Sequence, residues 1–476
     1  MSVEYDLVII GGGSSGLVVA SAAAQLKAKV ALIERARLGG DCLWFGCVPS
    51  KSIIRASRAA YEVKNARRFG INCENIEIDF AKVNAYVKEA IATIEPHDSP
   101  ERFRNLGVEV IFGDGQFIDR ETFHVNGRFF RARAFIIATG SRPKIPPIIG
   151  LKEAGYLTNE QIFSLKERPQ SIAVIGAGPI GCELGQALHR LGSEVTIISS
   201  RDRILPKEDW EAAKVVQTQF QSEGIRILTN SPCDRIEVLD DKKLLSSGER
   251  LLATVSDILV ATGRIPNTES LNLEAAGVTV SQKGIIVNNK LQTTNPRIYA
   301  CGDVIGGYQF THVASYEASV VLKNALFFPF AKTNYSIIPW CIFTEPELAR
   351  VGLTEEEARK QYGEDICVLK QDFALIDRAV AEAATSGFAK IVARRNGEIL
   401  GAHLVGASAG ELIHEVVMAM SYKLGVSALK RIIHIYPTLS EVNAKAALLL
   451  TKQRYAKNRR LQGILERFFK FRRFFS

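Results

Sequence analysis

The sequence predicts an α/β protein with two doubly wound dinucleotide-binding domains, followed by a C-terminal domain of α+β character. Two segments, residues 5–35 and 171–201, each contain a short apolar strand, a glycine-rich turn, a helix of small residues and a second strand. Each has the ~30-residue length of a βαβ unit. After about residue 336 no further glycine fingerprint of this kind occurs, and alternating strand patterns mix with helical ones.

Composition indicates a globular chain that carries its excess charge at one end. Of the 476 residues, 47% are hydrophobic and 23% are charged, which suits about three domains. The net charge of +9 is concentrated in residues 452–476, which hold nine basic side chains and one acidic side chain. No apolar run reaches the ~18 residues that span a bilayer, and no secretion signal precedes the first strand pattern. We therefore expect a cytoplasmic protein.

The first glycine turn has the parts of a dinucleotide fingerprint. Gly11, Gly13 and Gly16 follow the first strand directly in G-x-G-x-x-G spacing. Glu34 ends the next strand, 21 residues after Gly13. Glycines admit close backbone approach, the helix N-terminus faces a pyrophosphate, and the carboxylate accepts from a ribose hydroxyl. A tight turn without a ligand is the alternative, but strand, helix and acid together favour a cofactor site.

The second turn repeats the fingerprint with a different ending. Its glycines are Gly176, Gly178 and Gly181. The following strand ends at Ser199 and Ser200, where an acidic residue would select NAD, and Arg201 and Arg203 follow closely. An arginine at this place meets the 2′-phosphate of NADP, so the sequence favours NADPH over NADH. The alternative is that both arginines belong to a solvated turn and select neither nucleotide.

Two cysteines, Cys42 and Cys47, lie in the stretch GGDCLWFGCVPSK. On a regular helix their Cα atoms would be about 8–9 Å apart, beyond the ~7 Å limit for a disulfide. A bridge therefore requires non-helical backbone, which Gly46 permits and Pro49 favours by biasing Val48 away from the α region. Cys47 would then lie near a helix N-terminus, where a thiolate is stabilised.

This arrangement predicts a reactive cysteine pair. Metal binding alone would need a second ligand pair, which the sequence does not contain, and two unconnected core cysteines are the other alternative. The six remaining cysteines stand alone and suit small packed hydrophobic positions.

Together these motifs resemble the flavin-dependent pyridine nucleotide–disulfide oxidoreductases, which include glutathione reductase, dihydrolipoamide dehydrogenase and mercuric reductase. The resemblance rests on C-x₄-C-V-P-S-K between two fingerprints, on ATG at 138–140, ATGRIPN at 261–267 and CGDV at 301–304, and on YPTLSE at 436–441. It implies FAD on the first fingerprint, NAD(P)H on the second, and a homodimer built through the last domain.

The resemblance also implies roles for individual residues. Cys47 corresponds to the flavin-proximal thiolate, Cys42 to the thiol that meets substrate, and Lys51 and Glu183 to an ion pair beside the flavin. Asp303 would lie near the ribityl chain of FAD. Further cofactor positions fall on Gly40, Lys51, Gly115, Thr139, Gly140, Gly263, His312 and Ala314.

The same resemblance implies a division of the chain into four parts. Residues 1–150 and 268–335 would form a discontinuous FAD-binding domain, and residues 151–267 the NAD(P)-binding domain. Residues 336–450 would form the dimerisation domain, and residues 451–476 a basic amphipathic tail.

One departure from the family bears on the electron acceptor. Members that reduce disulfides have histidine immediately before the proline of an HPT…E motif, whereas this chain has Tyr436; the glutamate, Glu441, is present. His434 stands two residues too early for a simple replacement. Using tyrosine as a base at neutral pH costs roughly 4 kcal/mol relative to histidine. This favours a metal ion or another small oxidant over a disulfide.

The chain is therefore expected to be mercuric reductase-like, although two features of mercuric reductases are absent from it and two other functions are alternatives. The chain has no cysteine after Cys367 to form a C-terminal pair, and it lacks an N-terminal C-x-x-C domain. No metal site of its own is predicted. A dihydrolipoamide dehydrogenase or glutathione-type reductase is the rival enzyme. A non-catalytic, membrane-tethered flavoprotein scaffold is the rival of another class.

The C-terminal tail has an amphipathic helical pattern. Its apolar residues are Leu461, Ile464, Leu465, Phe468, Phe471 and Phe475, with Arg460, Arg467, Lys470 and Arg473 mostly elsewhere around the cylinder. Such a helix suits the surface of an anionic membrane. Docking on the enzyme's own body or on the partner subunit is the alternative, and nucleic-acid binding is not expected.

Overall fold

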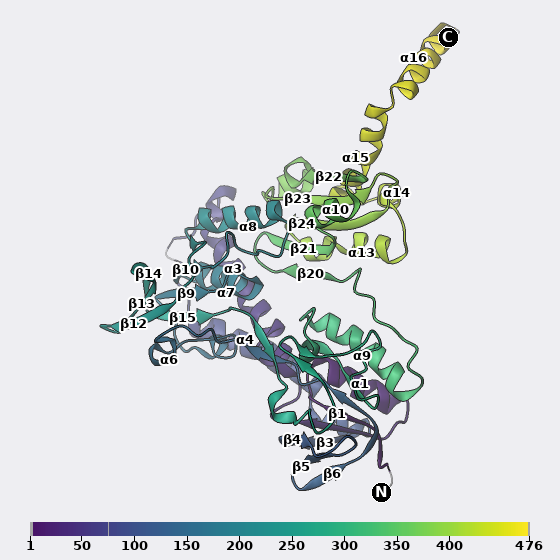
Figure 1. Cartoon of the computed structure of the whole chain (residues 1–476). Helices are drawn as coiled ribbons and strands as arrows, with labels where there is room; N and C mark the ends of the chain where they lie inside the picture. Colours follow the sequence, from purple (N-terminus) through teal and green to yellow (C-terminus); the bar gives the residue numbers. More distant parts are fainter. Residues whose placement is uncertain (1–2, 75, 475–476) are drawn as a thin grey trace. The chain divides into compact units, whose positions relative to one another are not determined.

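The computed structural model describes residues 3–74 and 76–474, drawn in Figure 1. The chain forms two compact units. The first unit comprises Met1–Ser200 and Ile227–Asn334, and the second unit comprises Arg201–Arg226 and Tyr335–Ser476. Residues 201–226 thus group with the C-terminal part rather than with the rest of residues 151–267. The four-part domain division stays a prediction.

The first unit contains the sheet that the first fingerprint predicts. Its five parallel strands run in the order β19-β7-β1-β2-β3. Their bounds are β1 Tyr5–Ile10, β2 Val30–Glu34, β3 Glu109–Phe112, β7 Ala132–Ile137 and β19 Ile298–Ala300. Side chains on both faces of β1 are buried, which explains its nearly continuous apolar run. Helices α1 (Ser14–Gln25) and α9 (Thr311–Leu326) pack against each other beside this sheet.

The second fingerprint opens another parallel sheet, with strand order β11-β10-β9-β15. Its strands are β9 Ser171–Ile175, β10 Glu194–Ile198, β11 Arg226–Leu228 and β15 Asp257–Val260, and α7 spans Pro179–Arg190. An antiparallel sheet of β12 Arg235–Leu239, β13 Lys242–Ser247 and β14 Arg250–Val255 covers one side of its core. Both βαβ predictions are therefore confirmed.

The second unit is built on an antiparallel sheet of order β20-β21-β24-β23-β22. Its strands are β20 Pro339–Ile342, β21 Glu347–Gly352, β22 Ile366–Asp372, β23 Phe388–Arg394 and β24 Ile399–Gly406. Its longer helices are α8 Trp210–Glu223, α10 Glu355–Tyr362, α13 His414–Ser421, α15 Glu441–Lys457 and α16 Arg459–Phe474. The sheet and helices confirm the predicted α+β character.

A buried cluster of charges joins α8 to this sheet. Lys390 of β23 is fully buried, and its Nζ lies 3.0 Å from Asp209 and 3.4 Å from Glu355, with Glu211 also in contact. Its cross-strand neighbour His403 is equally buried. Three carboxylates around one ammonium group compensate its loss of water, so the cluster fixes the start of α8 on the sheet.

Further helices and strands belong to the two units. The helices are α2 Gly40–Trp44, α3 Cys47–Lys64, α4 Phe80–Ile94, α5 Pro100–Asn105, α6 Leu151–Ala154, α11 Asp377–Ala381, α12 Ala409–Leu412 and α14 Val426–Arg431. The strands are β4 Gly115–Phe117, β5 Phe123–Val125, β6 Arg128–Phe130, β8 Ser141–Pro143, β16 Arg264–Pro266, β17 Val280–Ser281 and β18 Gly284–Ile285.

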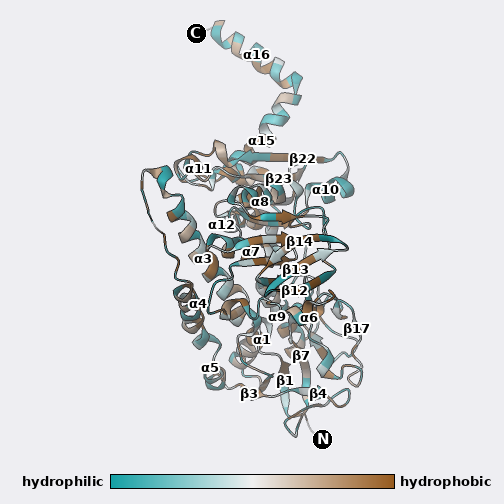
Figure 2. Cartoon of the chain, turned by 90° about the vertical axis from the view of Figure 1, so that its left-hand side faces the viewer, coloured by the Kyte–Doolittle hydropathy of each residue, from teal (hydrophilic) through white to brown (hydrophobic). Residues whose placement is uncertain are grey.

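The C-terminal tail is helical, as the pattern predicts, but its start differs. Helix α15 continues without a break across residue 450 to Lys457, and α16 begins at Arg459 (Figure 2). Within residues 3–74 and 76–474, no helix is long and apolar enough to cross a membrane.

Candidate active site

The first glycine turn is a place where two helix starts meet without side chains between them. Gly13 precedes α1, and a Cβ on Gly40, the first residue of α2, would lie 2.6 Å from the Gly13 Cα. Gly11 has a φ of +110°, and a Cβ there would collide with the Ala138 carbonyl. A Cβ on Gly16 would collide with the Gly11 carbonyl. The turn therefore exposes backbone amides at a spot that only glycine permits.

The carboxylate of Glu34 lies at this turn, as predicted from its place at the end of β2. Its Oε2 accepts from the amide of Gly12 at 2.7 Å, and Oε1 accepts from Ala36 at 2.8 Å. These bonds fix the orientation of the carboxylate beside the glycines.

The two Thr-Gly segments meet through Asn267. The hydroxyl of Thr139 donates to the Asn267 carbonyl at 2.7 Å, and the Asn267 side chain donates back to the Thr139 carbonyl at 2.9 Å. Gly140 has a φ of +69°, with open space where a Cβ would be. Gly263 has a φ of +128°, and its carbonyl accepts from the amide of Lys144.

Gly115 is a predicted cofactor position at which the packing of neighbouring strands already requires glycine. It begins β4, and a Cβ would collide with the ring of Phe123 and lie 2.8 Å from the His124 carbonyl. Close strand packing is sufficient to explain this residue, and cofactor contact by Gly115 stays a prediction.

Asp303 lies at the centre of a polar network that the sequence did not reveal. Ser141 donates to its Oδ2 at 2.6 Å, and Arg264 Nε is 3.8 Å from the same atom. The Arg264 guanidinium also reaches Asp41 of α2 at 3.2 Å. Burial raises the pKa of Asp303. Arg264 therefore links the CGDV turn to the helix that carries Cys42.

The backbone between the cysteines is interrupted, as predicted. Helix α2 ends at Trp44 and α3 begins at Cys47, with the break at Phe45 and Gly46. Asn159 donates to the Phe45 carbonyl at 3.0 Å and holds this turn. The expectation for Val48 was wrong, because Val48 is helical. Pro49 lies in the first turn of α3, where its missing amide costs no hydrogen bond.

The two cysteines are adjacent free thiols in this structure. The Cys42 thiol donates to the Cys47 sulfur, and this hydrogen bond lowers the pKa of Cys47 from 9.0 to about 6 against the opposing effect of burial. Thr311 of α9, 3.4 Å from the Cys47 sulfur, and Lys51 contribute in the same direction. Conversely, bonding to Cys47 and burial raise the pKa of Cys42. The pair therefore holds one proton at neutral pH.

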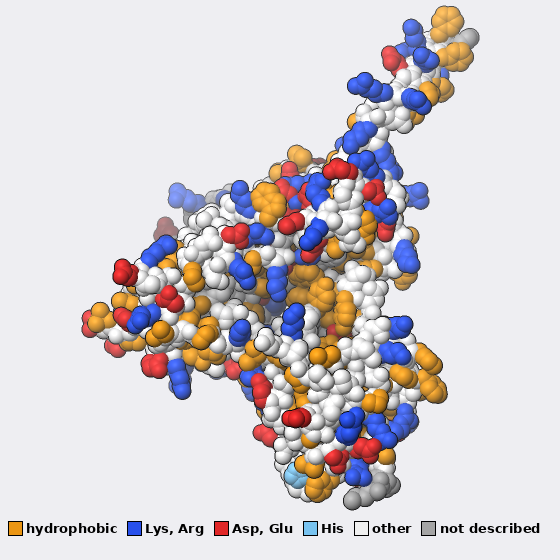
Figure 3. Space-filling model, in the orientation of Figure 1, with side chains coloured by type: hydrophobic (Ala, Val, Ile, Leu, Met, Phe, Trp, Pro, Cys, Tyr) orange, Lys and Arg blue, Asp and Glu red, His pale blue; other side chains and the backbone are white. Residues whose placement is uncertain are grey.

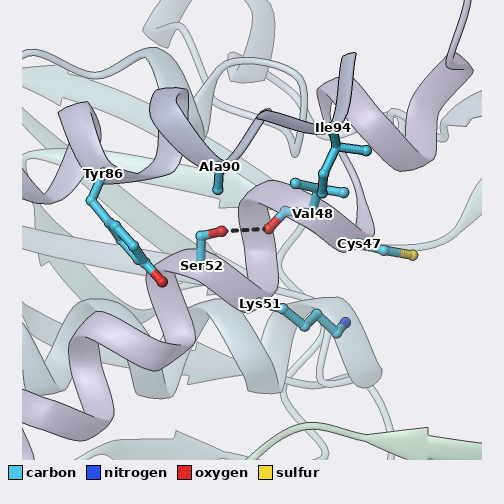
Figure 4. A pocket seen from close by; sticks show the side chains of 7 residues that line it. All are labelled: Cys47, Val48, Lys51, Ser52, Tyr86, Ala90 and Ile94. Atoms are coloured by element: carbon cyan, nitrogen blue, oxygen red, sulfur yellow. Dashed lines mark hydrogen bonds between the residues drawn. The ribbon is translucent and has the colours of Figure 1, made fainter. Parts of the chain in front are cut away.

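Lys51 forms the expected ion pair with Glu183. Its Nζ lies 3.0 Å from Glu183 Oε2 and joins α3 to α7, and the carboxylate is buried. An open pocket of about 420 Å³ begins at Cys47 and Lys51 and passes between α3 and α4. Figure 4 shows the ends of Cys47 and Lys51 pointing to the same side. The other lining residues are Val48, Ser52, Tyr86, Ala90 and Ile94.

Two predicted cofactor residues follow Thr311 on α9. The ring of His312 stacks on that of Phe310 with centroids 5.5 Å apart, and Ala314 is buried. Thr311 itself was not predicted, because a threonine 264 positions from the cysteine that it contacts leaves no local sequence pattern.

The second glycine turn has the same construction as the first. Gly178 precedes α7, with open space where its Cβ would be, and a Cβ on Gly181 would collide with the Gly176 carbonyl. Beyond β10, Ser199 is buried and Arg201 is exposed. The Arg203 guanidinium pairs with Asp202 at 3.5 Å and donates to the Pro206 carbonyl.

Tyr436 and Glu441 of the C-terminal motif do not form the expected dyad with each other. The Tyr436 hydroxyl donates to Asp377 at 2.9 Å, and this bond raises the pKa of Tyr436; it does not bond to Glu441. Glu441 begins α15, and its Oε2 is buried without a hydrogen-bond partner among the described residues. His434 Nε2 lies 3.3 Å from Glu415. Within the described ranges, no group of three or more metal-ligating side chains is arranged to hold a metal ion.

Comparisons with known proteins agree on one family. Residues 5–318 match the family described as pyridine nucleotide-disulphide oxidoreductase, and residues 338–447 match its dimerisation domain. A mercuric reductase of Bacillus cereus is 37% identical over 94% of this chain and 72% of its own length. A dihydrolipoyl dehydrogenase of Bacillus subtilis (strain 168) is 34% identical over 94% of this chain and 98% of its own. The Cu(II) complex of the HOCl-induced flavoprotein disulfide reductase RclA from Escherichia coli has a TM-score of 0.84 at 29% identity, covering 94% of this chain and 100% of that one.

Proposed function

The chain belongs to the pyridine nucleotide-disulphide oxidoreductase family, and from this premise we propose that it passes electrons from NADPH through FAD and the Cys42–Cys47 pair to a metal ion or another small oxidant. The observation that carries the proposal is the polarised thiol pair, with one thiol at a pKa of about 6 and its neighbour retaining the proton.

The residues present fit FAD. Gly11, Gly16 and Gly40 each stand where a Cβ would collide with neighbouring backbone, so the turn around Gly13 presents bare backbone, which suits a pyrophosphate. Glu34 suits a ribose hydroxyl. When bound, FAD supplies a two-electron carrier that takes hydride from the nicotinamide and hands the electrons to sulfur. Lys51 places a positive charge beside Cys47, and the carboxylate of Glu183 fixes the position of that charge.

The thiol pair balances the reduction of a divalent ion without an outside acid. Oxidation of the Cys47 thiolate and the Cys42 thiol to a disulfide releases two electrons and the one proton that the pair holds. Two electrons reduce one divalent ion to the metal or two ions by one electron each. The ion gives no leaving thiol that must be protonated.

Tyr436 supports a metal ion or small oxidant over a disulfide. Reduction of a disulfide releases thiols that need a proton donor near neutral pH. The hydrogen bond to Asp377 raises the pKa of Tyr436, so the phenol holds its proton more tightly than an ordinary tyrosine. The mercuric reductase among the relatives and the Cu(II) complex among the structures are consistent with this choice.

A disulfide reductase of the dihydrolipoamide dehydrogenase type is the second candidate. His434 favours it, because the imidazole pairs with the carboxylate of Glu415 at 3.3 Å and is a histidine–acid pair close to the expected place in the sequence. The dihydrolipoyl dehydrogenases among the relatives support the same candidate.

Steady-state NADPH oxidation against a panel of acceptors decides between them. Hg(II), Cu(II), quinones, lipoamide and glutathione disulfide form the panel, with Cys42→Ser and Cys47→Ser as variants. We expect turnover with a metal ion or quinone that both substitutions abolish. Ordinary turnover of lipoamide or glutathione disulfide would favour the second candidate. Unchanged activity of both serine variants would refute the thiol route, and no turnover with any acceptor would favour a scaffold.

NADPH is proposed as the donor on the basis of Arg201. This arginine is exposed directly after β10, and Ser199 and Ser200 stand where an acidic residue would select NAD. We expect Arg201→Ala to raise KM for NADPH about tenfold and to leave KM for NADH nearly unchanged. Arg250→Ala, an exposed arginine of β14, is the matched control. A wild-type preference for NADH would contradict the assignment.

A homodimer is proposed through the second unit. Ile433 is 96% exposed and Ile435 is 79% exposed in the single chain, and they stand three residues and one residue before Tyr436. Aliphatic side chains this exposed in a family dimerisation domain suit burial against a second copy. Light scattering should give twice the chain mass of 52.3 kDa. Ile433→Lys should lower that value, and a monomeric wild-type protein would contradict the proposal.

A further inference from the structure

Helix α16 lies beyond the part of the chain that matches the family. The dimerisation-domain match ends at residue 447, and α16 starts afresh at Arg459. The side chain of Asn458 accepts from the Leu461 amide at 3.0 Å and caps the new helix. None of the site residues described above lies on it.

One face of α16 is apolar and exposed. At 100° per residue, Leu461, Ile464, Phe468 and Phe471 fall within an arc of about 80°. Ile464 and Phe471 are each 62% exposed and Phe468 is 49% exposed. Figure 2 shows brown and teal patches alternating along this helix. Phe475, expected on the same face, lies outside the described residues.

Basic side chains border this face. Around the helix axis, Arg460 and Arg467 lie within about 40° of the edge of the apolar arc, while Lys470 and Arg473 lie farther from it. Glu466 is the one acidic residue between Lys452 and the C-terminus, against nine basic residues. Figure 3 shows the blue side chains interleaved with orange ones on this helix. Long basic side chains in this position keep their stems on an apolar layer and extend their charges to phosphates.

We propose that α16 is a membrane-surface helix that binds bilayers containing anionic lipid. The apolar arc suits the acyl boundary, and the bordering arginines suit the headgroup phosphates. The helix is about 24 Å long and lies in the plane of the surface rather than crossing it. A second copy of the helix is a poor occupant of this face because two strongly basic segments repel each other. Nucleic acid offers phosphates but nothing for the row of exposed apolar side chains.

Flotation of the holoenzyme with vesicles tests the proposal without reference to activity. We expect the full chain to float with phosphatidylcholine vesicles that contain about 30% phosphatidylglycerol and to bind pure phosphatidylcholine at least tenfold less. A chain ending at Asn458, which keeps α15 intact, should lose binding to both. Because the readout is binding, the acceptor assay can fail while this result stands.

Two substitutions separate the contributions of the face and its border. Ile464→Ser with Phe468→Ser keeps every charge and should weaken binding to anionic vesicles at least tenfold. Phe328→Ser with Phe330→Ser is the matched control, because these phenylalanines are 72% and 79% exposed outside the tail, and it should bind as the wild type does.

Changes to the basic border test the choice of lipid. Arg460→Gln with Arg467→Gln should remove most of the preference for anionic vesicles and shift binding to lower salt. Equal flotation by the full chain and the chain ending at Asn458 would overturn the proposal. Equal binding to neutral and anionic vesicles, or displacement from vesicles by duplex DNA at physiological salt, would also overturn it.

Discussion

The proton distribution in the cysteine pair makes a quantitative prediction about Cys47. A pKa of about 6 makes roughly 90% of Cys47 a thiolate at pH 7, against roughly 1% at its ordinary value of 9.0. The hydrogen bond from Cys42 is the largest cause, so Cys42→Ala should move the pKa of Cys47 most of the way back. Thr311→Val should move it less, because Thr311 contributes less than Cys42.

A measurement of the alkylation rate at pH 7 alone would not reveal this change in the pKa of Cys47. Thiolate nucleophilicity falls with pKa by a factor of about 10^0.45 per unit, so a three-unit fall costs roughly 20-fold in intrinsic reactivity. The ~90-fold gain in thiolate fraction at pH 7 then leaves only about a fourfold net advantage. At pH 5 to 6 the advantage grows to more than about 20-fold, because the ordinary thiol is almost fully protonated there.

The measurement is therefore the pH dependence of iodoacetamide labelling, read by mass spectrometry at Cys47 of the reduced holoenzyme. Labelling of exposed Cys73 in the same digests provides an internal reference. The wild type should show a midpoint near 6, and Cys42→Ala a midpoint well above 7. A wild-type midpoint near 9, or a midpoint that stays near 6 after Cys42→Ala, would refute the argument.

Three further predictions follow from charged and titratable groups. Lys51→Met should raise the labelling midpoint of Cys47, because Lys51 is one of the charges that lower its pKa; an unchanged midpoint in the same assay would contradict this. Lys390→Met should lower the free energy of unfolding by about 3–5 kcal/mol, because it leaves Asp209 and its neighbours uncompensated; denaturant titration beside Lys360→Met, an exposed control, measures the loss. Burial lowers the pKa of His403, so only the unfolded chain binds that proton below pH ~6.5. Stability should thus fall with acid by up to about 1.4 kcal/mol per pH unit, and His403→Leu should flatten that slope between pH 7 and 5.

The sequence was most informative where one local rule acts alone. Gly16 and Gly181 each face a backbone carbonyl at a distance that no Cβ tolerates, and the spacing of the glycines around them is visible in the printed sequence. The interruption between the cysteines was likewise predictable from residue types. The error at Val48 arose because proline is compatible with the first helical turn, so the helix starts two residues before Pro49.

The partners that set the chemistry were not predictable, because they come from distant parts of the chain. Thr311 contacts Cys47 across 264 positions, and Arg264 contacts Asp41 from beyond the second glycine fingerprint. Asp377 meets Tyr436 across 59 positions. Each contact depends on strand order and helix packing, and a single serine, threonine or aspartate carries no pattern that identifies its partner.

The positions of the protons on the cysteine pair and on Tyr436 predict different pH dependences for the two classes of acceptor. The pair loses one proton when it forms a disulfide, since Cys47 is already a thiolate above pH ~6. Reduction of a metal ion therefore needs no further acid, and its rate should be level from pH 7 to 9. Reduction of a disulfide produces two thiols and needs a second proton, which Tyr436 holds tightly through Asp377. That proton would come from solvent, so any disulfide turnover should fall as pH rises through this range. A histidine-like optimum for lipoamide, lost on His434→Gln, would instead show that the imidazole paired with Glu415 supplies the proton.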